Sequence, residues 1–125
     1  MIQKVLVIDD SMVSREIMRN YLEDASVGVT AYDSGKKAVE LLQSERNCEY
    51  DVVFMDIQMP DMNGYEAAKA LRSLGKGFES VRIIAMSANE ETENINRAFE
   101  SGMDDYIVKP VDIRKLYEML GIYGY

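Results

Sequence analysis

The chain alternates between short apolar runs and longer segments in which apolar residues recur three and four positions apart. The runs are rich in Val, Ile, Tyr and Phe and begin about every 25 residues, which is the rhythm of an alternating α/β domain. Because several runs are apolar at both odd and even positions, we expect parallel strands covered by helices on both faces. The predicted strands are Lys4 to Ile8, Val27 to Tyr32, Asp51 to Met55, Val81 to Met86 and Asp105 to Val108.

Parallel strands need crossover helices, and the segments between the runs have helical spacing. In the first of them, Ile17, Met18 and Tyr21 fall on one face. The predicted helices are Ser14 to Glu23, Lys36 to Glu45, Tyr65 to Leu74, Glu91 to Glu100 and Ile113 to Leu120.

Residues at the helix ends support these boundaries. Asn63 and Glu66 are spaced as a capping box, Asp112 can cap the last helix, and Gly102 can end the fourth in a left-handed turn. No linker or repeat interrupts the pattern. We therefore predict one flavodoxin-like (βα)5 domain over residues 1–125, a doubly wound sandwich whose parallel sheet has the order 2-1-3-4-5.

The charge of the chain excludes some partners. Fourteen basic residues against 22 acidic ones give a net charge of −8 over 125 residues, which disfavours direct contact with nucleic acid or an anionic membrane. No apolar run approaches the roughly 20 residues of a membrane-spanning helix. Since the N-terminus has no signal-peptide layout, we expect a cytoplasmic protein.

Cys48 is the sole cysteine and the chain has no histidine. An internal disulfide, Cys-His or Ser-His-Asp catalysis and imidazole metal ligands are therefore excluded. If phosphohistidine chemistry is involved, the donor histidine belongs to another molecule.

Polar residues follow four of the five predicted strands. Asp9 and Asp10 follow the first, Asp56 the third, Ser87 the fourth and Lys109 the fifth. The carboxyl ends of parallel strands share one edge, and in this strand order the ligand crevice lies between the first and third strands. The three aspartates converge there.

Carboxylates so close together repel, by on the order of 4 kcal/mol for two charges about 4 Å apart at an effective dielectric near 20. Lys109 offsets part of this repulsion, and a hard divalent ion such as Mg²⁺ fits the remainder. The set suits phosphoryl transfer. Asp56 is the predicted nucleophile, Asp9 and Asp10 hold the ion, and Lys109 and the Ser87 hydroxyl bond the phosphoryl oxygens.

Each residue also has an ordinary explanation when taken alone. Asp9 and Asp10 could cap a helix, Asp56 could be a turn residue, Ser87 could bond to backbone, and Lys109 could be a solvated charge. Their shared position at successive strand ends favours a common site.

These residues lie in motifs that resemble, in order and spacing over nearly the whole chain, the receiver domains of two-component response regulators. The motifs are Val7-Ile8-Asp9-Asp10-Ser11, Met55-Asp56-Ile57-Gln58-Met59-Pro60 with Asn63-Gly64, Ala85-Met86-Ser87-Ala88 and Tyr106-Ile107-Val108-Lys109-Pro110. The resemblance implies phosphorylation at Asp56, a metal pair at Asp9 and Asp10, and a metal contact from the backbone carbonyl of Gln58.

The resemblance also implies a conformational switch. The Ser87 hydroxyl moves toward the phosphoryl group while the ring of Tyr106 turns inward, and serine stands where the family often has threonine. Gln58 and Asn89 would flank the phosphoryl group and modulate its lifetime. A cis Lys109–Pro110 bond would fit the family.

The predicted function is a Mg²⁺-dependent switch, rather than a turnover enzyme, that takes its phosphoryl group from a sensor histidine kinase or a histidine phosphotransfer protein. A stand-alone regulator and a receiver within a hybrid histidine kinase both remain open. A magnesium-dependent aspartate phosphohydrolase is an alternative, although Gln58 occupies the position of its second aspartate.

One further hypothesis concerns partner contact. Met12 and Met59, together with Val13 and Ile17, are predicted to form an adaptable docking surface.

Overall fold

A computed structural model describes residues 2–88 and 91–123 of the chain. Within these residues, strands and helices alternate as predicted. The strands are β1 (Lys4–Ile8), β2 (Gly28–Tyr32), β3 (Val52–Asp56), β4 (Arg82–Ser87) and β5 (Asp105–Val108). The helices are α1 (Met12–Asp24), α2 (Gly35–Leu42), α3 (Gly64–Ser73), α4 (Thr92–Glu100) and α5 (Ile113–Leu120).

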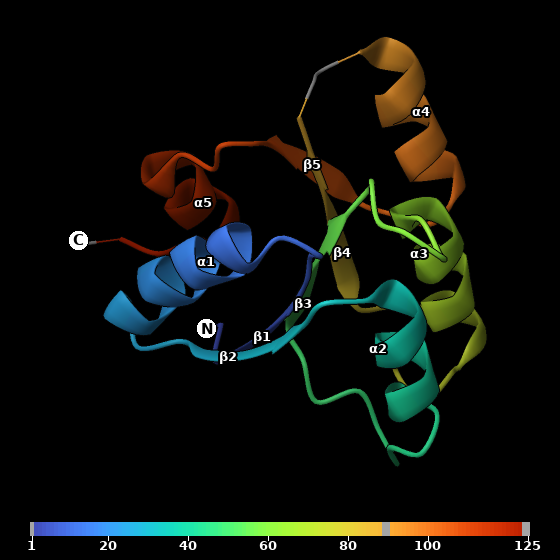
Figure 1. Cartoon of the computed structure of the whole chain (residues 1–125). Helices are drawn as coiled ribbons and strands as arrows, with labels where there is room; N and C mark the ends of the chain where they lie inside the picture. Colours follow the sequence, from blue (N-terminus) through green and yellow to red (C-terminus); the bar gives the residue numbers. More distant parts are fainter. Residues whose placement is uncertain (1, 89–90, 124–125) are drawn as a thin grey trace.

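The strands form a parallel sheet in the order β2-β1-β3-β4-β5, which confirms the predicted fold class. Helices α1 and α5 cover one face of this sheet, and α2, α3 and α4 cover the other (Figure 1). None of the helices in the described ranges is both long and apolar enough to span a membrane.

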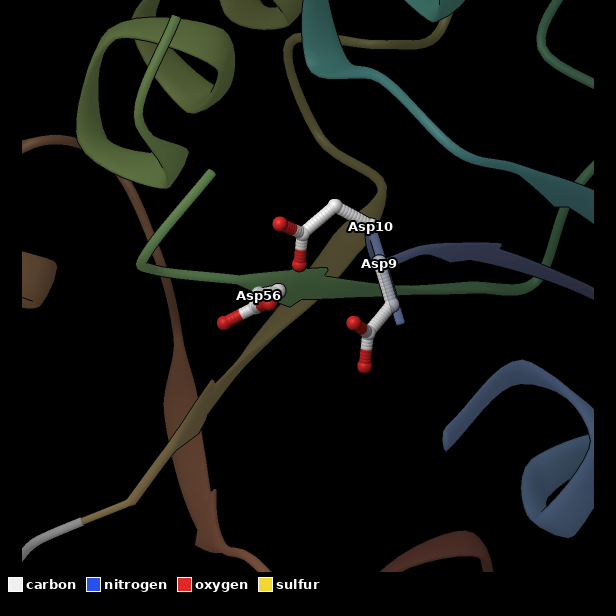
Figure 2. A group of neighbouring side chains, drawn as sticks. All are labelled: Asp9, Asp10 and Asp56. Carbon is white, nitrogen blue, oxygen red and sulfur yellow. The ribbon is translucent and has the colours of Figure 1, made fainter. Parts of the chain in front are cut away.

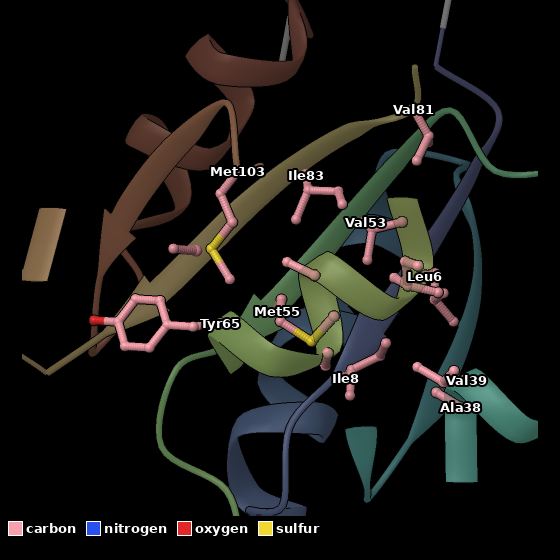
Figure 3. Close-up of a cluster of buried hydrophobic side chains, with 14 of the residues drawn as sticks. Leu6, Ile8, Ala38, Val39, Val53, Met55, Tyr65, Val81, Ile83 and Met103 are labelled. Atoms are coloured by element: carbon pink, nitrogen blue, oxygen red, sulfur yellow. The ribbon is translucent and has the colours of Figure 1, made fainter. Parts of the chain in front are cut away.

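Each face of the sheet has its own apolar core. Along β1, the side chains of Leu6 and Ile8 belong to the cluster beneath α2 and α3, of which Figure 3 shows part, whereas Val5 and Val7 belong to the cluster beneath α1 and α5. All four side chains are fully buried. This explains why the strand is apolar at every position, since side chains alternate between the two faces.

The helix starts have the predicted chemistry. The Asn63 side chain accepts from the backbone N–H of Glu66 at 2.9 Å while the Glu66 carboxylate accepts from the N–H of Asn63, so the capping box is confirmed. Asp112 caps α5, and Gly102 follows α4 with a φ of 99°. Ser11 caps α1 by accepting from the N–H of Ser14 at 3.2 Å.

Two strands end one residue later than predicted, and the difference affects the site. Asp56 is the last residue of β3, and Ser87 is the last residue of β4. The ladder continues past the apolar run, because the N–H of Ile57 donates to the carbonyl oxygen of Met86 at 3.1 Å. Both polar residues are therefore held by the sheet itself rather than by a loop.

Candidate functional site

The predicted polar residues come together at the carboxyl edge of the sheet. Asp9 and Asp10 follow β1, Asp56 ends β3, Ser87 ends β4 and Lys109 follows β5. Figure 2 shows the three carboxyl groups around the ends of β1 and β3. One oxygen from each of the three aspartates lies within 4.8 Å of the others.

Lys109 bridges two of the carboxylates. Its Nζ lies 2.7 Å from Oδ2 of Asp9 and 3.3 Å from Oδ2 of Asp56. Its backbone N–H donates to the carbonyl oxygen of Ser87 at 2.7 Å, which attaches it to the end of β4. The Lys109–Pro110 peptide bond is cis, as the family resemblance implied.

The two buried carboxylates have few hydrogen bonds. Oδ1 of Asp9 accepts from the N–H of Ser11 at 2.9 Å, but Oδ2, in contact with the Lys109 ammonium, makes no hydrogen bond of ordinary geometry with any described residue. Oδ1 of Asp56 accepts from the N–H of Gln58 at 3.1 Å. Asp9 is fully buried and Asp56 is 6% exposed.

This crowding changes the proton affinity of the acceptor. Burial, and then the negative charge of Asp9, raise the pKa of Asp56 to about 7, although Lys109 and the N–H of Gln58 act in the opposite direction. Burial alone would lower the pKa of Lys109, but contacts with Asp9 and Asp56 outweigh it, and that pKa is raised. The site therefore has less positive charge than its carboxylates need.

The carboxyl groups fit a hard divalent cation. Carboxylate oxygens with several waters are the environment that Mg²⁺ prefers. Asp9 offers a buried oxygen that lacks a hydrogen bond, whereas Asp10 is exposed and leaves room for waters. A bound cation would also supply the missing positive charge beside Asp56.

Gly64, at the start of α3, lies directly against the acceptor. Its N–H donates to the carbonyl oxygen of Ile57 at 2.8 Å. A Cβ at this position would lie 2.3 Å from the backbone oxygen of Asp56 and 2.8 Å from Cα of Ile57. The glycine was part of the family motif, but its contact with the acceptor backbone was not predicted.

Of the predicted switch and modulator residues, Ser87 ends β4 at this edge and Tyr106 lies within β5. Ser87 is 9% exposed, and Tyr106 is half-buried against the cluster of Figure 3. Their movement on phosphorylation stays a prediction. Gln58 is exposed beside Asp56, and Asn89 lies outside the described residues.

A cavity of about 450 Å³ adjoins this edge, and its lining includes residues that the sequence analysis did not predict as part of the site. It runs from Asp10 and Ser87 to Tyr65 on α3 and Arg97 on α4. Tyr65 and Arg97 lie in two different predicted helices and are far apart in the chain, so only the fold brings them together.

The predicted docking surface is partly wrong. Met12 and Val13 are 67% and 66% exposed at the start of α1, and Ile17 is 36% exposed one turn later. Met59 is not on this surface, because it is 9% exposed and packs into the opposite core, where a Cβ on Gly35 would lie 3.0 Å from its methyl carbon.

Comparisons with known proteins agree on one family. The family model for the response regulator receiver domain matches residues 5–121. The hybrid signal transduction histidine kinase L of Dictyostelium discoideum is 36% identical over 123 residues, which are 97% of this chain and 7% of that protein. The two-component response regulator ORR11 of Oryza sativa is 38% identical over 116 residues, 90% of this chain and 77% of that protein.

Solved structures have the same fold. The chemotaxis protein CheY4 of Vibrio cholerae aligns with a TM-score of 0.87 at 27% identity, over 97% of this chain and 98% of that one. A second solved structure is the receiver domain of the sensor histidine kinase PA1611 of Pseudomonas aeruginosa, with a magnesium ion coordinated in its active site cleft. It aligns with a TM-score of 0.83 at 28% identity, over 96% of this chain and 95% of that one. A third is the receiver domain of Ssk1 of Saccharomyces cerevisiae, crystallised with the histidine phosphotransfer protein Ypd1. It aligns with a TM-score of 0.83 at 26% identity, over 94% of this chain and 85% of that one.

Proposed function

Because the chain belongs to the response regulator receiver family, we propose that Asp56 accepts a phosphoryl group from the phosphohistidine of a partner and that residues 1–125 act as one conformational switch. The observation that carries this proposal is the position of Asp56. Its carboxyl group ends a central strand, 3.3 Å from the Lys109 ammonium and beside two further carboxylates.

The reaction is a displacement at phosphorus. A carboxylate oxygen of Asp56 attacks the phosphorus atom, the bond between phosphorus and the imidazole nitrogen breaks, and its electron pair stays on that nitrogen. The product is an acyl phosphate on Asp56 and a free histidine on the partner. In this proposal Lys109, 3.3 Å from Asp56, and the hydroxyl of the buried Ser87 would bond the transferred oxygens.

Mg²⁺ would be held by Asp9, Asp10, Asp56 and the backbone carbonyl of Gln58. When bound, it supplies positive charge that stabilises the phosphoryl oxygens. The fit rests on the buried oxygen of Asp9 and on the three grouped carboxylates. The magnesium ion in the receiver of PA1611 supports the same choice of metal.

The proposed donor is a sensor histidine kinase or a histidine phosphotransfer protein. The hybrid kinase relatives and the receiver crystallised with Ypd1 support this choice. The relatives include both a protein of which this chain spans 7% and one of which it spans 77%, so both arrangements remain open for this receiver. The cytoplasmic location stays a prediction.

A switch and a hydrolase differ in turnover. After phosphorylation of Asp56, we propose slow self-dephosphorylation rather than repeated hydrolysis of small phosphate esters. The family match supports the switch and not the aspartate phosphohydrolases.

Intact-mass spectrometry tests the proposal. The purified chain is mixed with phosphorylated donor proteins and Mg²⁺, and we expect the mass of one phosphoryl group to be added. This addition should not occur when Mg²⁺ is chelated beforehand, nor in Asp56→Asn. Equal labelling of the Asp56→Asn variant would contradict the assignment. Many turnovers of a phosphate ester per chain would favour the hydrolase.

A further inference from the structure

The cavity beside Asp56 bears on which phosphodonors the site can accept. It is lined by Asp10, Ser87 and Gln58, which belong to the reaction site, and also by Arg97. At about 450 Å³ it is large enough for the non-transferred part of a small phosphodonor.

Arg97 is an exposed residue that stacks on an aromatic ring. Its guanidinium carbon lies 4.3 Å from the centroid of the Tyr65 ring, a cation–π geometry. Tyr65 is 5% exposed, and its hydroxyl donates to the carbonyl oxygen of Asn94, one turn before Arg97 on α4, at 3.3 Å. Figure 3 shows the Tyr65 hydroxyl pointing away from the other labelled core side chains.

Arg97 has no ion-pair partner in the part of the chain that the structure describes. A cation that lines a cavity attracts anions into it, even in a chain whose net charge is −8.

We propose that Arg97 is a specificity-determining residue that favours small acyl phosphates as direct phosphodonors to Asp56. This inference rests on the proposed function. Asp56 attacks phosphorus, the bond from phosphorus to the acyl oxygen breaks, and the electron pair stays on that oxygen, so that a carboxylate leaves without needing a proton. The guanidinium of Arg97 attracts this developing negative charge, and it offers nothing to a leaving group that departs neutral.

The test compares two donors of the same phosphoryl group. With acetyl phosphate the leaving group is acetate, and with phosphoramidate it is neutral ammonia. Initial rates of Asp56 phosphorylation are measured with Mg²⁺ for the unmodified chain, Arg97→Gln and Arg97→Lys. The control is Arg114→Gln, which removes the same charge from an exposed position on α5.

We expect Arg97→Gln to slow the reaction with acetyl phosphate about threefold to fivefold relative to phosphoramidate, the size of a solvent-accessible charge interaction. The ratio of the rate with acetyl phosphate to the rate with phosphoramidate should be mostly retained in Arg97→Lys and fully retained in Arg114→Gln. Added salt should lower this ratio in the unmodified chain. Equal slowing with both donors, or no slowing with either, would overturn the role of Arg97. Absence of labelling by both donors in the unmodified chain would instead overturn the proposed function.

Discussion

At the scale of single residues, the close packing of Asp9, Asp56 and Lys109 makes the acceptor sensitive to pH. The pKa of Asp56 is raised to about 7 from an ordinary value of 3.8, so the folded chain holds this proton more tightly than the unfolded chain. The resulting stabilisation is fully present below pH 3.8 and is lost as the pH rises through about 7.

Asp56→Asn should therefore stabilise the metal-free protein at pH 8 relative to the unmodified chain, by on the order of 2 to 4 kcal/mol, and much less at pH 4. Urea unfolding with a chelator at both pH values measures the difference. A stability difference that does not change with pH would show that Asp56 is not the group responsible.

Gly64 is the second residue with a specific consequence. In Gly64→Ala, the new methyl group would lie 2.3 Å from the backbone oxygen of Asp56, so α3 or the end of β3 must move. We expect phosphorylation by phosphoramidate to slow by about tenfold to a hundredfold, because small displacements of reacting groups are costly.

The matched control is Gly28→Ala, at the first residue of β2. Its methyl group would lie 3.4 Å from the nearest atom, the backbone oxygen of Gln3. Rates are compared well below the thermal midpoint of each variant. If Gly64→Ala is phosphorylated at the rate of the unmodified chain but is less stable, the close approach of α3 to Asp56 serves folding alone.

At the scale of elements, α1 presents apolar side chains next to the site. Met12, Val13 and Ile17 are exposed, and a cavity of about 310 Å³ lies between α1 and the segment of Lys109 and Pro110. We propose that the phosphohistidine-bearing partner docks here, since the donor histidine must reach Asp56 from nearby.

Met12→Asp should slow phosphotransfer from the cognate donor protein about tenfold or more, as expected for a contact in the interface core, and leave phosphoramidate labelling unchanged. Leu41→Asp, on the exposed surface of α2 across the sheet, serves as control. Unchanged transfer to Met12→Asp would show that this surface is not the docking site.

The elements themselves follow closely from the sequence. Strands β1 and β5 have the predicted bounds, whereas β3 and β4 each begin and end one residue later than predicted, because hydrogen bonding continues beyond the apolar run. Local patterns were sufficient for this, as were caps such as Asn63 with Glu66. The stack of Arg97 on Tyr65 could not be predicted, because nothing in either segment specifies how α4 packs on α3.

The site was predictable for a related reason. Asp9, Asp56 and Lys109 each end or follow a parallel strand, so the topology alone brings them to one edge. Met59 was predicted wrongly because its motif position indicates proximity to the site but not the direction of its side chain, which points into the core.

At the scale of the whole molecule, metal binding should change stability. A cation that binds only the folded chain stabilises it by about 1.4 kcal/mol at a free concentration tenfold above Kd. Mg²⁺ should therefore raise the thermal midpoint at pH 8, and a chelator should reverse the rise.

Asp10→Asn should weaken this response, whereas Asp24→Asn, at the opposite end of α1, should not. A midpoint that Mg²⁺ shifts equally in both variants would indicate nonspecific screening of the net charge rather than a site at the sheet edge.

The two separate cores have one more consequence. Strand β3 lies between β1 and β4, and all five of its residues are buried. Its amide protons should exchange with deuterium only through global unfolding, whereas those at the start of α1 should exchange through local opening. The phosphoryl group would then be attached to the slowest-exchanging backbone of the protein, and any structural response to it would have to occur in the helices and loops around that strand.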